Sequence, residues 1–275
     1  MTQKLLLACD MDRTVLPNGQ QPISPQALAR FRAFTERPEV TLAYLTGRDL
    51  GLIRKGIQEY KIPLPDLAVG DVGTTVYIRK DDHFEEDTNW ACIIGKDWNG
   101  YTNESIGELL QSIPELTPQE PEKQNTFKRS YYTDENIEKQ KLIRQVREIL
   151  EAKNIKAAII FSIDEQMHKG LLDILPLSAT KEDALKYLCH NFGFGENETV
   201  YAGDSGNDIQ PLTSGYRAIL VANARDEVRR EILEIGKKKE ILEKIYCAQG
   251  NWENMNGNYT AGILEGLAHF GHKTE

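Results

Sequence analysis

The sequence predicts an α/β fold in which a mainly parallel sheet is interrupted by an inserted α+β domain. Two observations carry this prediction. Short apolar runs alternate with helical segments near both ends of the 275-residue chain, a pattern typical of parallel βαβ units. In the middle of the chain this alternation is lost, and charged and proline-containing stretches replace it. We therefore expect a core formed by residues 1–81 and 177–275, with residues 82–176 inserted between its two parts.

The first part of the core is expected to begin with a buried strand at 4–9, because residues 5–9 form an uninterrupted apolar run. That run is too short for a signal peptide or a membrane span. Ser24 followed by Pro25 predicts the start of a helix, since proline is tolerated at the first helical position. Further strands are expected at 40–45, 66–69 and 74–79, with a helix after Asp49.

The remaining elements follow from the same patterns. The inserted domain is expected to hold strands at 127–133, 156–163 and 171–175, with a charged amphipathic helix at 134–153. Beyond it, helices are expected at 181–191, 208–214 and 226–235, and strands at 199–202 and 217–221. A last helix is expected to begin near Asn258.

The composition narrows the class of partner. With 33 Lys and Arg against 42 Asp and Glu, the formal charge is −9, which gives no general attraction for nucleic acid or an anionic membrane. The four cysteines are far apart and have no metal-ligand spacing, so we expect reduced thiols and a cytoplasmic protein. A small-molecule partner is expected, without nucleic acid or membrane, and a monomer is the working expectation for the oligomeric state.

Polar residues gather where strands end and helices begin. In a parallel sheet these junctions lie at one edge, beyond the carboxyl ends of the strands, which is where ligands bind in open α/β folds. The second junction opens a helix, whose free N–H groups suit phosphate. The four junctions are Asp10-Met11-Asp12-Arg13-Thr14, Thr46-Gly47-Arg48, Lys181, and Gly203-Asp204-Ser205-Gly206-Asn207-Asp208.

The carboxylates of these junctions predict a metal site. Four carboxylates at one sheet edge (Asp10, Asp12, Asp204 and Asp208) would repel one another strongly, and Mg²⁺ relieves that repulsion where phosphate shares the site. An ionised aspartate beside Mg²⁺ can attack phosphorus and form an aspartyl phosphate. Each motif alone has a simpler interpretation, as a helix-capping loop, a turn or a calcium-type loop. Their order and equivalent placement together indicate phosphoryl transfer.

The motifs resemble those of the haloacid dehalogenase superfamily of phosphatases. The resemblance implies a Rossmann-like core with an inserted α+β cap domain that determines substrate specificity. It also implies that Asp10 is the nucleophile and Asp12 the general acid and base. Thr46, Gly47, Arg48, Lys181 and Asn207 would bind the phosphoryl group or orient the nucleophile, with Thr46 and Lys181 counted among the catalytic residues. The implied metal ligands are Asp10, the Asp12 main-chain carbonyl, Asp204 and Asp208, the last directly or through water.

A narrower resemblance is to the sucrose-phosphate phosphatase branch. It is carried by Leu172-Asp173-Ile174-Leu175-Pro176 before the lysine, by Phe127-Lys128-Arg129-Ser130-Tyr131, and by the closing segments Asn256-Gly257-Asn258-Tyr259 and 261–267. In that branch the lysine corresponding to Lys128 reaches the sugar. Glu182 and Arg129 depart from the pattern, and the cap is extended around 90–100. There Trp98 and Tyr101 would either stack on a sugar or pack the cap against the core.

The resemblance implies a Mg²⁺-dependent phosphomonoester hydrolase that acts on a sugar phosphate through an aspartyl phosphate. Sucrose 6-phosphate or a related glycosyl or disaccharide phosphate is the expected substrate. One alternative is a phosphomannomutase-like sugar phosphomutase, which returns the phosphate to sugar rather than to water. Another is a non-enzymatic, receiver-like switch in which Asp10 is phosphorylated; such a module needs neither Asp12 nor a cap.

Overall fold

A computed structural model describes residues 4–164 and 167–274 and divides the chain into two compact units, which are Met1–Glu86 with Lys181–Glu275, and Asp87–Thr180. We call them the core and the cap. The expected boundaries, after residues 81 and 176, are each displaced by a few residues. Strand β5 (His83–Glu86) pairs with β4 (Thr75–Lys80) and so belongs to the core sheet. Ser178 donates its N–H to Asp97 of the cap at 2.7 Å.

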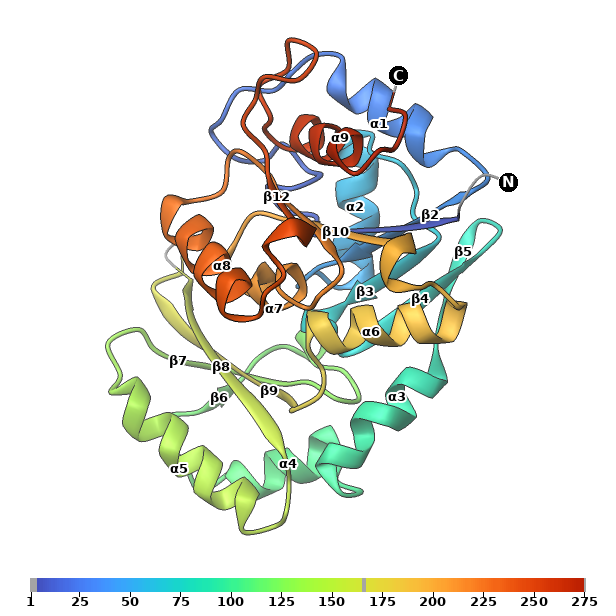
Figure 1. The fold of residues 1–275 in the computed structure, drawn as a ribbon. Helices are drawn as coiled ribbons and strands as arrows, with labels where there is room; N and C mark the ends of the chain where they lie inside the picture. Colours follow the sequence, from blue (N-terminus) through green and yellow to red (C-terminus); the bar gives the residue numbers. More distant parts are fainter. Residues whose placement is uncertain (1–3, 165–166, 275) are drawn as a thin grey trace. The chain divides into compact units, whose positions relative to one another are not determined.

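The core is built on an eight-stranded sheet within the described residues, in the order β12-β11-β10-β1-β2-β3-β4-β5 (Figure 1). The strands from β12 to β3 are parallel, whereas β4 and β5 are antiparallel additions at one edge. This confirms the predicted α/β fold with a mainly parallel sheet. The other strands are β1 (Leu5–Cys9), β2 (Val40–Leu45), β3 (Leu67–Gly70), β10 (Thr199–Gly203), β11 (Arg217–Leu220) and β12 (Ile245–Cys247).

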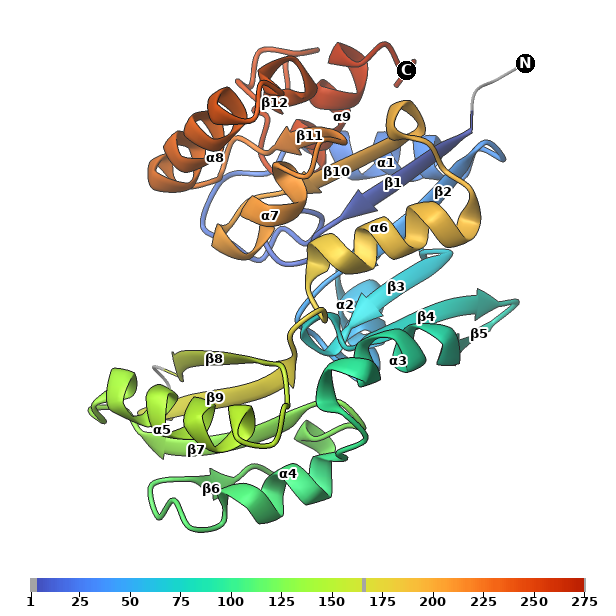
Figure 2. The same ribbon diagram turned by 60° about the horizontal axis from the view of Figure 1, so that its bottom comes forward.

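Helices cover both faces of the core sheet (Figures 1 and 2). Helices α1 (Ala27–Thr35), α2 (Leu50–Tyr60) and α9 (Thr260–His269) bury Phe31, Ile53 and Ile263 against one face, together with Leu5 and Leu7 of β1. The other face carries α6 (Lys181–Phe192), α7 (Ile209–Leu212) and α8 (Asp226–Lys238). Burial on both faces explains why the central strands read as continuous apolar runs.

The predicted start of the first helix is wrong. Helix α1 begins at Ala27, and its N-cap residue is Gln26, which makes no side-chain cap. The Ser24 hydroxyl instead accepts the N–H of Asn256 at 3.0 Å, and this contact ties the first loop to a segment more than 200 residues away. A cap that depends on such a distant partner cannot be read from the local sequence.

In the part of the cap that the structure describes, a four-stranded antiparallel sheet in the order β6-β7-β9-β8 has helices packed on one face (Figure 2). Ile106, Val146 and Leu172 meet in its own apolar core. Trp98 is fully buried there and meets the Phe127 ring edge-on at 5.6 Å, so it packs inside the cap. The elements are α3 (Thr88–Ile94), α4 (Asn103–Leu110), β6 (Thr117–Pro118), β7 (Arg129–Asp134), α5 (Lys139–Glu151), β8 (Ala157–Asp164) and β9 (Lys169–Pro176).

Two further features concern the chain as a whole. All four cysteines are free thiols. No helix within residues 4–164 and 167–274 is long and apolar enough to cross a membrane.

The sheet brings three of the four polar junctions together. Cys9 at the end of β1 lies opposite Tyr44 of β2 and Ala202 of β10, so the loops that follow these parallel strands are neighbours at one edge. The remaining junction differs from the prediction. The strand before Lys181 is β9, which belongs to the cap sheet and not to the core sheet. Lys181 opens α6 where the chain re-enters the core.

Candidate active site

Asp10 lies at the centre of the site. Its N–H donates to the carbonyl of Ala202 at 2.9 Å, which places Asp10 directly beyond the ends of β1 and β10. The Lys181 ammonium donates to Asp10 Oδ1 at 2.7 Å and to Asp208 Oδ1 at 2.8 Å. All three side chains are nearly or fully buried. The structure therefore brings Asp10 together with two residues that lie about 170 and 200 positions further along the sequence.

Asp208 organises the loop after β10. Its Oδ1 also accepts the Tyr201 hydroxyl at 2.6 Å, and its Oδ2 accepts the backbone N–H groups of Asp204 and Ser205, each at 3.1 Å. Gly203 permits this arrangement, because a Cβ there would lie 2.6 Å from the Asp208 Cβ. Both Asp208 oxygens therefore accept hydrogen bonds from the protein. The bond from the Asp204 N–H holds Asp204 in place.

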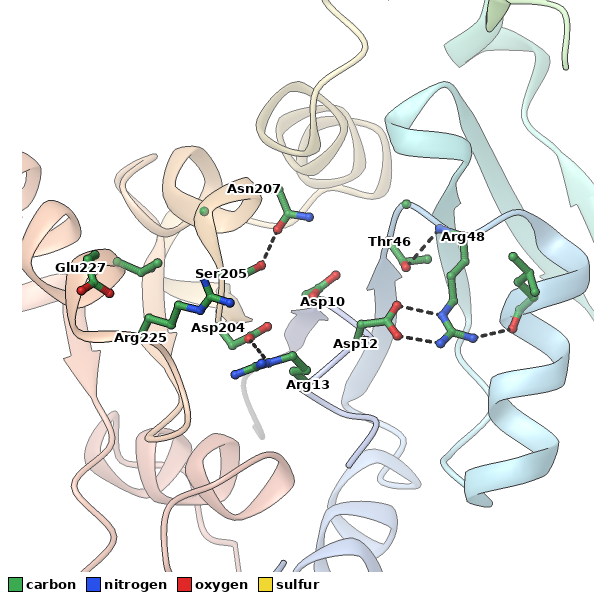
Figure 3. Close-up of a pocket in the computed structure, with 14 residues that line it drawn as sticks. Asp10, Asp12, Arg13, Thr46, Arg48, Asp204, Ser205, Asn207, Arg225 and Glu227 are labelled. Carbon is green, nitrogen blue, oxygen red and sulfur yellow. Dashed lines mark hydrogen bonds and ion pairs between the residues drawn. The ribbon is translucent and has the colours of Figure 1, made fainter. Parts of the chain in front are cut away.

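Asp204 is bonded through both of its oxygens. The Arg13 guanidinium donates from Nε to Oδ2 at 3.1 Å (Figure 3). The Thr14 hydroxyl donates to Oδ1 at 3.1 Å. Arg13 and Thr14 belong to the first motif of the sequence, which predicts no role for either residue. The sequence feature that could have indicated a role for Arg13 is its positive charge directly after the carboxylates of Asp10 and Asp12.

One oxygen from each of Asp10, Asp204 and Asp208 lies within 4.8 Å of the others, and all three residues are buried. A buried donor set made only of carboxylate oxygens suits a hard divalent cation such as Mg²⁺. The Asp12 side chain is not part of this group. The resemblance implies that Asp12 would contribute its main-chain carbonyl, and that ligand set stays a prediction.

The Asp12 carboxylate is held instead by Arg48. Nε donates to Oδ2 at 2.8 Å and Nη2 to Oδ1 at 2.6 Å (Figure 3). The Asn18 amide also donates to Oδ1 at 2.6 Å. Partial burial raises the pKa of Asp12, but the hydrogen bonds and charge of Arg48 outweigh it, so the net pKa is lowered. Asp12 is therefore ionised while this fork is intact.

The second motif forms the opposite wall of the site. The Thr46 N–H donates to the Val69 carbonyl at 2.9 Å, and its buried hydroxyl accepts the Arg48 N–H at 3.3 Å. Asp49 then caps α2 by accepting the Leu52 N–H at 2.8 Å. The motif predicted that the N-terminus of α2 would bind phosphate, but the Asp49 side chain occupies the N-cap position there.

A cavity of about 790 Å³ opens onto these groups. It adjoins both the carboxylates and the helix-opening motif, and it extends to the start of α8. The Asn207 carboxamide, which accepts the Ser205 hydroxyl at 2.8 Å, also faces it (Figure 3). The residues lining it are Asp10, Asp12, Arg13, Thr46, Gly47, Arg48, Leu52, Asp204, Ser205, Gly206, Asn207, Arg225, Glu227 and Val228, all of the core.

Burial of several carboxylates around one lysine perturbs their acidity. Burial is the main cause that raises the pKa of Asp10 to about 8, helped by Asp208 and opposed by Lys181. Burial, together with Asp208, also raises the pKa of Asp204 to about 6. For Lys181 burial acts to lower the pKa, but Asp10 and Asp208 raise it further and keep the ammonium charged.

One predicted site residue, Lys128, lies in the cap rather than with the others. Lys128 closes a tight turn in which its backbone exchanges hydrogen bonds with that of Asn125, each at 3.3 Å. The Asn103 amide donates to the carbonyls of both of these residues. The Lys128 side chain is half-buried.

Comparison with known proteins gives the family. Residues 3–271 match the model of the sucrose-6F-phosphate phosphohydrolase family. The chain belongs to that family. A HAD-like hydrolase of Nitrosococcus oceani is 46% identical over 98% of this chain and 72% of its own. A mannosylfructose-phosphate phosphatase of Agrobacterium fabrum is 28% identical over 97% of this chain and 96% of its own.

A solved structure agrees with the family assignment. The sucrose-phosphatase of Synechocystis, in complex with sucrose and phosphate, has a TM-score of 0.70 and 28% identity, with 98% of each chain covered. The predicted resemblance is thus confirmed. The chain is a haloacid dehalogenase phosphatase of the sucrose-phosphatase branch, and a non-enzymatic receiver-like switch is set aside.

Proposed function

We propose that this phosphatase hydrolyses the phosphate ester of a glycosyl or disaccharide phosphate through an aspartyl phosphate on Asp10. The observation that carries the proposal is the position of Asp10. Its carboxylate is buried at the end of β1, bonded to Lys181 at 2.7 Å, and faces the cavity beside Asp204 and Asp208. This combines a carboxylate nucleophile with fixed positive charge for a phosphoryl group.

The reaction proceeds in two displacements. An Asp10 oxygen attacks phosphorus, the bond from phosphorus to the sugar oxygen breaks, and the leaving oxygen takes a proton from Asp12. Water then attacks the aspartyl phosphate and gives a proton back to Asp12, so that phosphate is released and Asp10 is restored. Lys181, the Thr46 hydroxyl and the backbone N–H of Gly47 stabilise the transferred group, and Asn207 orients it.

Arg48 determines when Asp12 is available as an acid. The ionised state that Arg48 favours is the one that accepts a proton from water in the second displacement. To donate a proton in the first displacement, Asp12 must lose this partner. Arg48 also lines the cavity, so we expect its guanidinium to turn from Asp12 to the phosphate oxygens when substrate binds.

Mg²⁺ fits the donor set, with Asp10, Asp204 and the Asp12 main-chain carbonyl as ligands and Asp208 holding Asp204 in place. When bound, it neutralises charge on the phosphoryl oxygens and keeps Asp10 ionised. Apart from the attacking water, residues of the protein supply the nucleophile and the proton-transfer group.

The proposed substrate is sucrose 6-phosphate or a related glycosyl phosphate. The family description, the mannosylfructose-phosphate phosphatase and the sucrose-bound relative support this class. Lys128 is the proposed sugar contact, and the Asn103 amide holds the turn that presents it.

A phosphate-release screen tests this function. The substrates are sucrose 6-phosphate, mannosylfructose phosphate, trehalose 6-phosphate, glucosylglycerol phosphate and hexose monophosphates, each with Mg²⁺ and with EDTA. We expect one disaccharide or glycosyl phosphate to be preferred by kcat/KM, and Asp10→Asn to abolish release. Normal turnover by Asp10→Asn would remove Asp10 from the mechanism. Conversion of glucose 1-phosphate to glucose 6-phosphate without free phosphate would instead indicate a mutase.

The same assay tests the cap residue. Lys128→Ala is expected to raise KM about tenfold or more for the preferred sugar phosphate and to change KM little for p-nitrophenyl phosphate. An equal effect on both substrates would argue against a sugar contact.

A further inference from the structure

Asp204 has a counter-ion of its own. Its carboxylate is 3% exposed and bonds to the Arg13 guanidinium, whose side chain is 35% exposed and borders the cavity (Figure 3). Lys181 bonds to Asp10 and Asp208 and not to Asp204. Two cations therefore pair with these three buried carboxylates, and Arg13 is the one that pairs with Asp204.

Arg13 is fixed in place by unusual backbone geometry and by reciprocal contacts. Its φ is +60°, in the left-handed region that arginine rarely adopts. Its N–H donates to the Asn18 side chain at 2.8 Å, and its Nη2 donates to the Asn223 carbonyl at 3.2 Å. The buried Asn223 amide returns a hydrogen bond to the Arg13 carbonyl at 2.7 Å. Such over-determined strain is typical of functional positions.

We propose that Arg13 sets the affinity of the site for a divalent cation by competing with it for Asp204. This rests on the metal site of the proposed function. A metal cation that binds Asp204 approaches a carboxylate whose Oδ2 already accepts a hydrogen bond from the Arg13 guanidinium. The guanidinium partly neutralises the carboxylate, and it also repels the metal cation.

The arrangement couples metal binding to phosphate binding. With Arg13 present, a divalent cation would leave the cluster with excess positive charge, which a phosphate dianion in the same cavity removes. The affinity for the metal is therefore low in the absence of phosphate and higher when phosphate is bound. Without Arg13, the negative cluster would bind the cation tightly whether or not phosphate is there.

Calorimetric titration of the full-length protein with MgCl₂ alone tests the proposal without turnover. Arg13→Asn removes the charge and keeps a residue that tolerates positive φ, and Arg13→Gly is a second neutral variant in case the first folds poorly. We expect either variant to bind Mg²⁺ about tenfold more tightly than the parent chain. Arg13→Lys, which keeps the charge, should stay within about threefold of it. Inorganic phosphate should then tighten Mg²⁺ binding more in the parent chain than in the neutral variants.

Two controls locate the effect. Arg54→Gln removes one positive charge from an exposed position on α2 that does not line the cavity, and it should leave Mg²⁺ affinity unchanged. Asp204→Asn should abolish the tight binding gained in Arg13→Asn.

Unchanged or weaker Mg²⁺ binding by both neutral variants would overturn the proposal. Weaker binding would mean that Arg13 orients Asp204 for the metal. If no variant binds Mg²⁺ at all, this proposal and the metal site both fail. The role of Asp10 is judged separately, by phosphate release from the Asp10→Asn variant.

Discussion

At the scale of single residues, the electrostatics of the site centre on the buried contact between Lys181 and Asp10. Lys181 partly offsets the burial of two carboxylates, but burial still raises the pKa of Asp10 to about 8. The pKa of Asp204 is raised in the same way, to about 6. Both values lie well above those of an exposed aspartate, so the folded protein binds protons that the unfolded chain releases.

The metal-free protein should therefore lose stability as the pH rises. Below about pH 4 both states hold the Asp10 proton; between about pH 4 and 8 only the folded state does. The free energy of unfolding should fall across this window, with a contribution from Asp10 of about 1 kcal/mol per pH unit. Urea denaturation in EDTA at pH 5.5, 6.5 and 7.5 measures it. Asp10→Asn should show a shallower decline, and equal slopes for the two proteins would contradict the assignment.

The fork between Arg48 and Asp12 gives a second prediction at this scale. Arg48→Met removes both donors to Asp12 and a cation from the cavity, so kcat should fall about tenfold to a hundredfold. Arg48→Lys keeps the charge but not the fork, and should be intermediate. Steady-state kinetics with the preferred sugar phosphate measure both variants. Arg54→Met, on the exposed side of α2, is the matched control, and an unchanged kcat in Arg48→Met would separate Arg48 from proton transfer.

The sequence could predict the residues of the site better than their pairings. Asp10, Thr46 and Asp204 could be proposed as site residues because each follows a strand of a recognisable βα pattern. The contact of Arg13 with Asp204 spans 191 positions, and the contact of Arg13 with Asn223 spans 210. No periodicity records such pairs, since they depend on which strands become neighbours in the sheet.

At the scale of elements, α9 is held in the core by a buried carboxylate. Glu265 accepts the Tyr246 hydroxyl at 2.8 Å and the N–H groups of Gln249 and Gly250 at 2.8 and 3.0 Å. It thus joins α9 to β12 and to the loop that follows. Three donors satisfy a charge that would otherwise be costly to bury.

Removing this acceptor should destabilise the core. Glu265→Ala leaves two partly buried N–H groups and a partly buried hydroxyl without this acceptor, so the free energy of unfolding should fall by about 3 kcal/mol. Glu265→Gln keeps one acceptor oxygen and should lose about half as much. Urea denaturation compares the two variants. A loss below about 1 kcal/mol for the alanine variant would mean that solvent or a rearranged loop replaces the contacts.

Element boundaries were predictable where packing is local and not where a distant partner decides them. The apolar run at Val40–Leu45 is matched by β2, because every position but one is buried in the sheet. Strand β5 was missed, since its charged residues belong to an exposed edge and only its pairing with β4 makes it a strand. Helices α3 and α4 were also missed, because seven and eight residues are too few to show a clear helical period.

At the scale of the whole molecule, the chain forms two units that each bury an apolar core of their own. The core cluster spans β1, β2 and helices α1, α2 and α9, and the cap cluster spans β7, β9 and helices α4 and α5. In the proposed function, this organisation assigns chemistry and selectivity to different units. The residues proposed for phosphoryl transfer all belong to the core, and the proposed sugar contact belongs to the cap. The net charge of −9 does not reveal this division between the two units. It is a sum over the whole chain and includes the buried carboxylates of the site.

Separate cores predict that the cap can be destabilised without the core. Leu172 on β9 is fully buried against the cap helices, so Leu172→Ala should cost the cap about 2–5 kcal/mol. Leu264→Ala, fully buried on α9, is the matched change in the core. Hydrogen exchange measured by mass spectrometry should show faster exchange of β7 and β9 in the first variant, with β1 and β10 protected as in the parent chain, and the reverse in the second. Because contacts within each unit hold its own strands, exchange that rises in both units together in both variants would mean that the core and the cap unfold as one cooperative body.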